Sequence, residues 1–212
     1  MAQLPGMLDC NNSQGHFIRV AFSYVKMSNV VILIDGGYIE KILKNEFANT
    51  KIDYVLLSEE IRASISTELD ILRTYYYHSL PYKGNPPTKE ESERFARKQK
   101  FFNALNRKPR FEVKLGRLVR IGPDEHGSYY FEQKMVDALL SIDLVHLSAT
   151  GKITHAALVA GDGDFVPAMK VAKNDGVSLW LVHGKMRHKE LWETADERME
   201  LNEKIIKKIK LR

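Results

Sequence analysis

The stretch VVILIDGGY, residues 30–38, decides how this chain folds. Its first five residues are all β-branched or aliphatic, a run typical of a strand buried on both faces of a parallel sheet. Asp35 and two glycines end the run, and a helix is expected to follow because the next apolar residues recur with helical spacing. These residues are Tyr38, Ile42, Leu43 and Phe47. A strand followed by a helix that packs back on the sheet is the basic unit of an α/β fold.

The same alternation continues along the chain. Further strands are predicted over residues 71–78, 111–115, 129–131, 156–160 and 177–182. Between them, Thr88 and Glu91 form a capping-box pattern that begins a helix, Pro109 ends it, and residues 134–147 carry a second strong helical pattern. Strands that alternate with helices predict a parallel, doubly wound sheet in one α/β domain.

The chain divides into three predicted parts. Residues 1–28 show no periodicity and contain a second candidate start at Met27, so they are interpreted as a loose arm or a mis-annotated start. Residues 29–187 form the folded domain. Residues 188–212 are predicted as a charged amphipathic helix, which is free to pack on the same domain or on a second copy of the chain.

Cysteine content and hydropathy restrict the class of protein. The single cysteine, Cys10, excludes a disulfide framework and a Cys-based zinc site, and it favours a reducing, cytoplasmic setting. No apolar run reaches the length that crosses a bilayer, so no membrane partner is expected. With 212 residues, of which 44% are hydrophobic and 28% charged, the composition is that of an ordinary globular protein.

Acidic residues follow the predicted strands. Asp35, Asp162 and Asp164 each come after a buried strand, and in open parallel sheets the carboxyl ends of the strands meet at one edge. Asp137 joins them if the first turn of its helix faces that edge. Grouped carboxylates repel one another unless a cation compensates, and Mg²⁺ or Mn²⁺ prefers oxygen ligands of this kind. Such a site suits hydrolysis of phosphodiester bonds.

Each acid also has a structural interpretation. Asp164 is well placed to cap a helix that begins at Phe165, and the dipeptide Asp35–Gly36 is typical of a turn. Asp143 lies six positions after Asp137, on a different helix face, which favours a supporting or structural role. Convergence on one edge is what favours a functional site.

Basic residues are concentrated between positions 94 and 120, in a chain of net charge +5. A field of that sign attracts a polyanion, although a solvated helix face explains such a run equally well. Lys134, three residues before Asp137, either contacts a phosphate or is an ordinary exposed lysine. The residues expected to bind nucleic acid are Arg94, Lys98, Lys114, Arg117 and Lys134.

Three sequence blocks, in this order and spacing, resemble the NYN domain family, the LabA-like branch of the PIN-like nucleases. They are VILIDGGY at 31–38, KMVDALLSID at 134–143 and LVAGDGDFVP at 158–167. The resemblance implies a PIN-like three-layer α/β/α sandwich with a mainly parallel central sheet. It also implies an acidic pocket that binds Mg²⁺ or Mn²⁺ and cleaves RNA.

Residue by residue, the resemblance assigns four acids as catalytic and metal-binding. Tyr38 and Asp143 are expected to support these acids from behind. One position departs from the family: many members have Asn where this chain has Gly37, so a polar side chain that would position water or phosphate is missing. The four assigned acids are Asp35, Asp137, Asp162 and Asp164.

The sequence therefore predicts a metal-dependent endoribonuclease acting on single-stranded or structured RNA, with DNA as a further substrate to be tested. Two alternatives remain open. Gly37 motivates a catalytically weak or inactive RNA-binding or regulatory module of the same fold. The same acids would also serve a phosphatase or nucleotide hydrolase.

Overall fold

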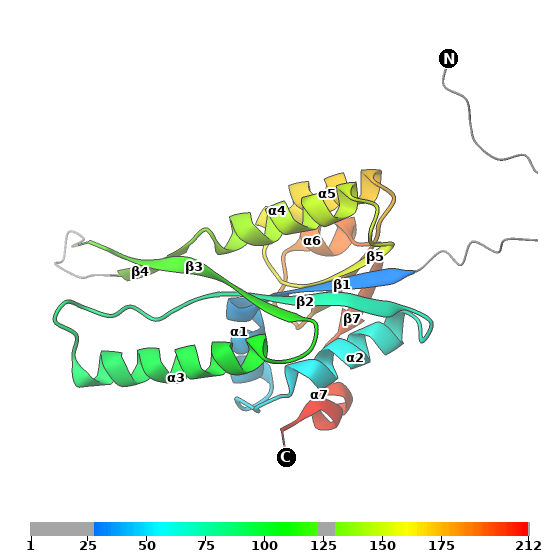
Figure 1. Cartoon of the computed structure of the whole chain (residues 1–212). Helices are drawn as coiled ribbons and strands as arrows, with labels where there is room; N and C mark the ends of the chain where they lie inside the picture. Colours follow the sequence, from blue (N-terminus) through cyan, green and yellow to red (C-terminus); the bar gives the residue numbers. More distant parts are fainter. Residues whose placement is uncertain (1–27, 123–129, 212) are drawn as a thin grey trace, which may run out of the picture.

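A seven-stranded sheet organises the computed structural model, which describes residues 28–122 and 130–211 (Figure 1). The side chains of residues 119–121 and 130–134, and the predicted arm up to residue 27, lie outside this description. The strands are β1 (Asn29–Asp35), β2 (Asp70–Ser79), β3 (Phe111–Ile121), β4 (Tyr130–Lys134), β5 (His155–Val159), β6 (Ser178–His183) and β7 (Glu197–Glu200). The helices are α1 (Gly36–Glu46), α2 (Tyr54–Ile65), α3 (Lys89–Asn106), α4 (Val136–Ala149), the 3₁₀ turn η1 (Gly163–Phe165), α5 (Val166–Asn174), α6 (Lys189–Thr194) and α7 (Glu203–Ile209).

The strand order is β4-β3-β2-β1-β5-β6-β7, and β1 lies at the centre with β2 and β5 parallel to it on either side. The parallel pairing continues through β3, β6 and β7, whereas β4 pairs antiparallel with β3. Within the described chain the sheet is thus parallel except for one edge strand. The predicted α/β class with a mainly parallel sheet is confirmed.

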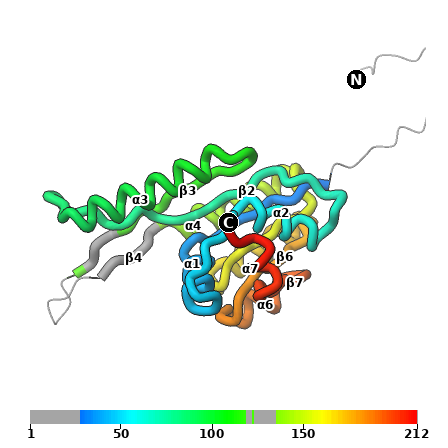
Figure 2. The backbone as a smooth tube through the Cα atoms, turned by 90° about the horizontal axis from the view of Figure 1, so that it is seen from below, coloured from blue at the N-terminus to red at the C-terminus, as the bar shows by residue number. Residues whose placement is uncertain are grey.

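Helices cover both faces of the sheet and produce three layers (Figures 1 and 2). Alternate residues of β1 enter different cores: Val30, Ile32 and Ile34 pack with α1, α2, α3 and α7, whereas Val31 and Leu33 pack with α4, α5 and α6. All five are fully buried. This burial on both faces explains why β1 is a continuous apolar run rather than an alternating one.

Most predicted elements have counterparts in the structure. The capping box between Thr88 and Glu91 is present at the start of α3. The helix predicted over residues 134–147 begins later, at Val136, because Lys134 belongs to β4 and Met135 takes a left-handed conformation with φ of 73°. This turn separates the antiparallel strand from the helix.

The C-terminal part differs from the single amphipathic helix predicted over residues 188–212. It forms α6, then β7 parallel to β6, then α7. Asp196 accepts a hydrogen bond from the Leu179 backbone at 2.8 Å and pairs with Lys173 at 2.7 Å, which fixes the chain beside β6. Asn202 then caps α7 by accepting from the Ile205 backbone at 3.1 Å. Local anchoring and capping therefore interrupt the helical pattern.

No helix in the described ranges is long and apolar enough to span a membrane.

Candidate active site

Asp35 ends β1 and caps α1. Its carboxylate accepts hydrogen bonds from the backbone N–H groups of Gly37 at 2.9 Å and Tyr38 at 3.1 Å. Burial raises the pKa of Asp35, the nearby charge of Asp137 adds to this, and the two backbone hydrogen bonds offset part of it. Asp35 is therefore an acid at the strand end, as predicted, and it caps a helix that begins at Gly36 where the Asp–Gly dipeptide alone predicted a turn.

Asp162 follows β5, which is parallel to β1, so it lies at the same edge of the sheet as Asp35. Its side chain caps η1 by accepting from the Asp164 backbone at 3.1 Å. Asp164 is exposed in the first turn of η1 and does not cap the next helix, since Phe165 occupies the N-cap of α5 without a side-chain hydrogen bond. The expected capping role of Asp164 therefore belongs to Asp162.

Asp137 lies in the first turn of α4, which packs against η1. Burial raises the pKa of the Asp137 carboxyl, and the charges of Asp162 and Asp164 raise it further. Because Asp137 also raises the pKa of Asp35, the four predicted acids form one electrostatically coupled set contributed by β1, α4 and the segment after β5.

These acids are not arranged as a preformed metal cage. In the described ranges, no three His, Cys, Asp or Glu side chains are grouped closely enough to hold a metal ion. The donor set nevertheless suits Mg²⁺ or Mn²⁺, because mutually repelling carboxylates are what a hard divalent cation stabilises, and Mg²⁺ commonly uses one or two carboxylates and keeps several waters.

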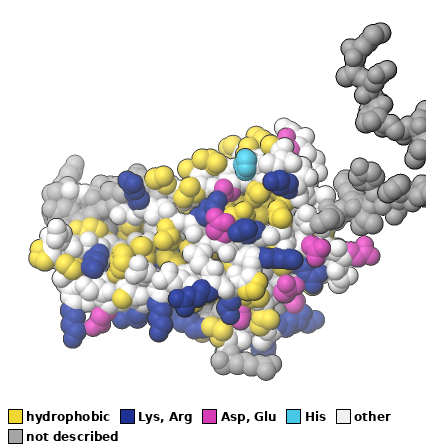
Figure 3. Space-filling view, viewed as in Figure 1, with side chains coloured by type: hydrophobic (Ala, Val, Ile, Leu, Met, Phe, Trp, Pro, Cys, Tyr) yellow, Lys and Arg dark blue, Asp and Glu magenta, His cyan; other side chains and the backbone are white. Residues whose placement is uncertain are grey.

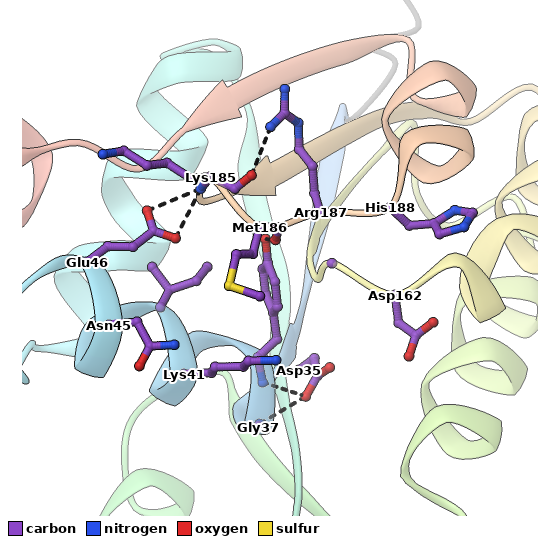
Figure 4. Close-up of a pocket in the computed structure, with 13 residues that line it drawn as sticks. Asp35, Gly37, Lys41, Asn45, Glu46, Asp162, Lys185, Met186, Arg187 and His188 are labelled. Atoms are coloured by element: carbon purple, nitrogen blue, oxygen red, sulfur yellow. Dashed lines mark hydrogen bonds between the residues drawn. The ribbon is translucent and has the colours of Figure 1, made fainter.

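A pocket of about 600 Å³ lies beside the acids, between α1 and residues 184–188, the loop that follows β6 (Figure 4). Asp35 and Asp162 contribute to its wall, and three cationic side chains line it as well. The cations are Lys41, Lys185 and Arg187. None of the three was predicted from the sequence. Two of them lie in the HGKMRHK segment at 183–189, which follows a parallel strand as GDGD at 161–164 does. Because loops after parallel strands form the site in open sheets, the same rule could have found these two.

The 184–188 loop is held in place by hydrogen bonds from two other segments. The hydroxyl of Tyr38 donates to the Met186 carbonyl at 2.7 Å and accepts from the Gly184 backbone at 3.1 Å. Glu46 accepts from the Lys185 backbone at 3.0 and 3.1 Å, and His188 N–H donates to the Gly161 carbonyl at 2.8 Å. Tyr38 thus positions the pocket wall, a more specific role than was expected of it.

The residues predicted to bind nucleic acid are dispersed. Lys98 pairs with Glu40, and Lys114 pairs with Asp143 at 2.7 Å. Arg94 and Arg117 are exposed and line separate cavities, and the side chain of Lys134 is outside the described residues. Lys and Arg side chains gather along the edge of the molecule formed by α3, as Figure 3 shows, but this edge carries none of the four acids.

The ion pair of Lys98 belongs to a polar network that joins α1, β2 and α3 through Glu40, His78 and Lys98. Burial alone would raise the pKa of Glu40, but hydrogen bonds with His78 and Lys98 lower it to about 2. His78 is itself buried, with Nε2 3.2 Å from Glu40 Oε2. The positive charge of Lys98 is therefore paired with the Glu40 carboxylate and is not free to bind a polyanion.

Asp143 connects α4 to the sheet. It accepts a 2.7 Å hydrogen bond from the hydroxyl of buried Tyr77 on β2 and pairs with Lys114 on β3. Its position on a helix face different from that of Asp137 agrees with the structural alternative considered above.

Replacing Tyr77 with Phe is expected to lower the free energy of unfolding by about 1.5–3 kcal/mol, the usual contribution of a hydrogen bond to a charged group. The phenyl ring keeps the packing, and Lys114 still neutralises Asp143. Chemical denaturation measures the effect, with the partly buried Tyr75→Phe as the control. Equal stability of Tyr77→Phe and the wild type would show that this bond contributes nothing.

Comparison with known proteins identifies the family. None of the curated proteins compared matches this chain significantly. The crystal structure of MurG from Acinetobacter baumannii aligns with 82% of this chain and 41% of that chain, at a TM-score of 0.39 and 9% identity, a similarity too weak to indicate a shared function. The NYN domain family model matches residues 29–202, most of the chain, and this protein therefore belongs to the NYN domain family of the PIN-like nuclease superfamily.

Proposed function

We propose that this protein is a metal-dependent endoribonuclease that hydrolyses phosphodiester bonds. The observation that carries the proposal is a pocket lined by Asp35, Asp162 and three cations in a member of a nuclease superfamily, with Asp137 close enough for its charge to raise the pKa of Asp35. The raised pKa values of Asp35 and Asp137 mean that their charged forms stabilise the fold poorly by themselves, so their arrangement is better explained by a cationic ligand.

Asp35 and Asp162 would hold Mg²⁺ or Mn²⁺, with Asp137 as a further ligand and Asp164 as a ligand or a hydrogen-bond partner of bound water. The bound ion would lower the pKa of a water molecule and offset charge on the phosphate. The hydrogen bonds from the backbone of Gly37 and Tyr38 fix the orientation of the Asp35 carboxylate. Of the predicted nucleic-acid set, the exposed Arg94 and Arg117 would guide the strand from further away.

A second candidate is an RNA-binding or regulatory module with weak or no turnover. Two observations favour it: Gly37 lacks the side chain that many family members carry there, and the described acids are not grouped as a preformed metal site. Phosphatase activity on small nucleotides stays a third possibility. Cytoplasmic location and self-association remain predictions from the sequence.

The decisive experiment incubates the protein with unstructured RNA or DNA and Mn²⁺ and compares the wild type with Asp162→Asn. We expect cleavage of RNA by the wild type, loss of cleavage with a chelator, and a rate for Asp162→Asn lower by more than about 100-fold, because removing a ligand costs at least as much as disturbing the groups that orient it.

Asp175→Asn provides the matched control, since Asp175 is exposed and follows α5, away from the acids. Equal, chelator-resistant cleavage by the wild type and Asp162→Asn would rule out the proposed mechanism. Tight RNA binding without cleavage under Mg²⁺ or Mn²⁺ would favour the regulatory module instead. Phosphate release from nucleotides without cleavage of the polymer would favour the phosphatase.

A further inference from the structure

We propose that the pocket between α1 and the 184–188 loop is a subsite for one unpaired nucleotide of the substrate strand. In this assignment Lys41 binds its phosphate, Lys185 and Arg187 bind the phosphates that flank it along the strand, and the base packs against Met186. The inference rests on the proposed function and makes it specific: it names where the polyanion is bound and why a single strand is preferred.

Charge gives the first argument. The ammonium groups of Lys41 and Lys185 have no ion-pair partner within the described chain, whereas Lys98 and Lys114 of the predicted set are both paired with carboxylates. Arg187 donates to the Lys185 carbonyl at 3.2 Å and lies 5.6 Å from the Trp192 ring centre, contacts that orient the guanidinium without neutralising it. Among the side chains that the structure describes, the free positive charge near the acids is therefore in this pocket.

Position gives the second argument. The same pocket is lined by Asp35 and Asp162, the two acids assigned to the metal, and Lys41 lies on the same side of it as Asp35, whereas the side chains of Lys185 and Arg187 extend away from the acids (Figure 4). A phosphate bound by Lys41 therefore lies next to the acids. The pocket thus holds anion-binding groups and carboxylates together. A phosphodiester needs both, because its negative charge requires cations and its hydrolysis requires the acids.

Size and polarity indicate what accompanies the phosphate. A volume of about 600 Å³ is within the range of pockets that enclose a small molecule, and a mononucleotide belongs to that size class. Met186 is 55% exposed at the edge of this pocket, which offers an apolar surface to a base. Asn45 adds an amide that both donates and accepts hydrogen bonds, as base edges require.

A subsite that takes a base into a pocket favours single-stranded substrates. A base in a duplex must be unstacked and unpaired before it enters a pocket, and an unpaired base avoids this cost. The loop that forms the wall is already fixed by Tyr38, Glu46 and the Gly161 carbonyl, so little ordering is needed when the nucleotide binds.

The test measures binding by the full chain in the presence of a chelator, so that cleavage plays no part. The triple variant Lys41→Ala, Lys185→Ala, Arg187→Ala is compared with a control that removes three exposed lysines outside the pocket, Lys152→Ala, Lys204→Ala, Lys207→Ala. The probes are a labelled single-stranded oligoribonucleotide, the same sequence as a duplex, adenosine 5′-monophosphate and inorganic phosphate. Thermal unfolding verifies that both variants are folded.

We expect the pocket variant to lose more affinity for the single strand than the control does, by at least about tenfold, and to have a shallower salt dependence, with a log–log slope smaller by about 2 for three phosphate contacts. The wild type should bind the mononucleotide more tightly than phosphate, and the single strand more tightly than the duplex.

Equal losses in the two variants, equal affinity for mononucleotide and phosphate, or preference for the duplex would each overturn the subsite. These outcomes are independent of turnover. Cleavage by the wild type together with equal binding losses would sink the subsite and leave the nuclease. Selective loss of binding in a protein that never cleaves would keep the subsite and remove the nuclease.

Discussion

Asparagine at position 35 is expected to reduce metal-dependent RNA cleavage by more than about 100-fold while raising the melting temperature of the metal-free protein. The amide oxygen of Asn can still accept from the Gly37 and Tyr38 backbone, so α1 keeps its cap. What disappears is a charge that burial and Asp137 make unfavourable. The Asp35 carboxylate would thus lower the stability of the metal-free protein and be needed for cleavage when the metal is bound.

The pH dependence follows from the direction of this pKa. Because the pKa of Asp35 is raised in the folded protein, the folded state binds more protons than the unfolded chain between the ordinary and the raised value. Stability of the metal-free wild type therefore falls as pH rises through that interval, and Asp35→Asn should lose this contribution. Thermal unfolding across acidic pH, with and without Mn²⁺, measures both effects.

Asp35→Ala separates the charge from the cap. Alanine removes both, and loss of an N-cap costs about 1 kcal/mol, which lowers the melting temperature of a domain of this size by about 2–4 °C. The Ala variant should therefore be less stable than the Asn variant at neutral pH. If Mn²⁺ stabilised Asp35→Asn as much as the wild type, Asp35 would not be a metal ligand.

Alanine at position 161 is expected to lower the free energy of unfolding by about 1–3 kcal/mol and to weaken RNA binding as well. A β-carbon there would lie 2.1 Å from Cε2 of Tyr38, far inside normal contact. The ring cannot swing aside without breaking the bonds of its hydroxyl to Met186 and Gly184. Crowding at residue 161 would therefore displace the loop that forms the pocket wall.

A double-mutant cycle with Tyr38→Ala tests this mechanism. Once the ring is removed, the added methyl group has room, so Gly161→Ala should cost much less in the Tyr38→Ala background than in the wild type. Chemical denaturation gives the four free energies. Equal costs in the two backgrounds would show that the methyl group acts through something other than the ring.

The central part of this fold was predictable because its signals are local. A run such as residues 30–34 has few alternatives to a buried strand, and Asp35 and Asp162 were predicted at strand ends because each directly follows such a run. Residues 188–212 were harder, since β7 is only four residues long and its place is fixed by contacts of Asp196 with Leu179 and Lys173 that are distant in sequence.

The three cations that line the pocket could not be singled out from the other basic residues by sequence alone, for a related reason. Whether a lysine is free or neutralised depends on tertiary partners: Lys98 finds Glu40 and Lys114 finds Asp143, each contributed by another element. The density of basic residues therefore pointed to α3 and β3, whereas the unpaired charges near the acids come from α1 and a short loop.

The position of β7 makes residues 197–211 part of the folding unit rather than an attachment to it. Paired with β6, β7 covers backbone groups that would otherwise form an open edge of parallel sheet, and α7 buries Ile206 and Ile209 against the α2 side of the core. An exposed edge of this kind is a template for pairing between molecules. A chain that ended before residue 197 would thus be prone to self-association through β6, even though all four acids would be intact.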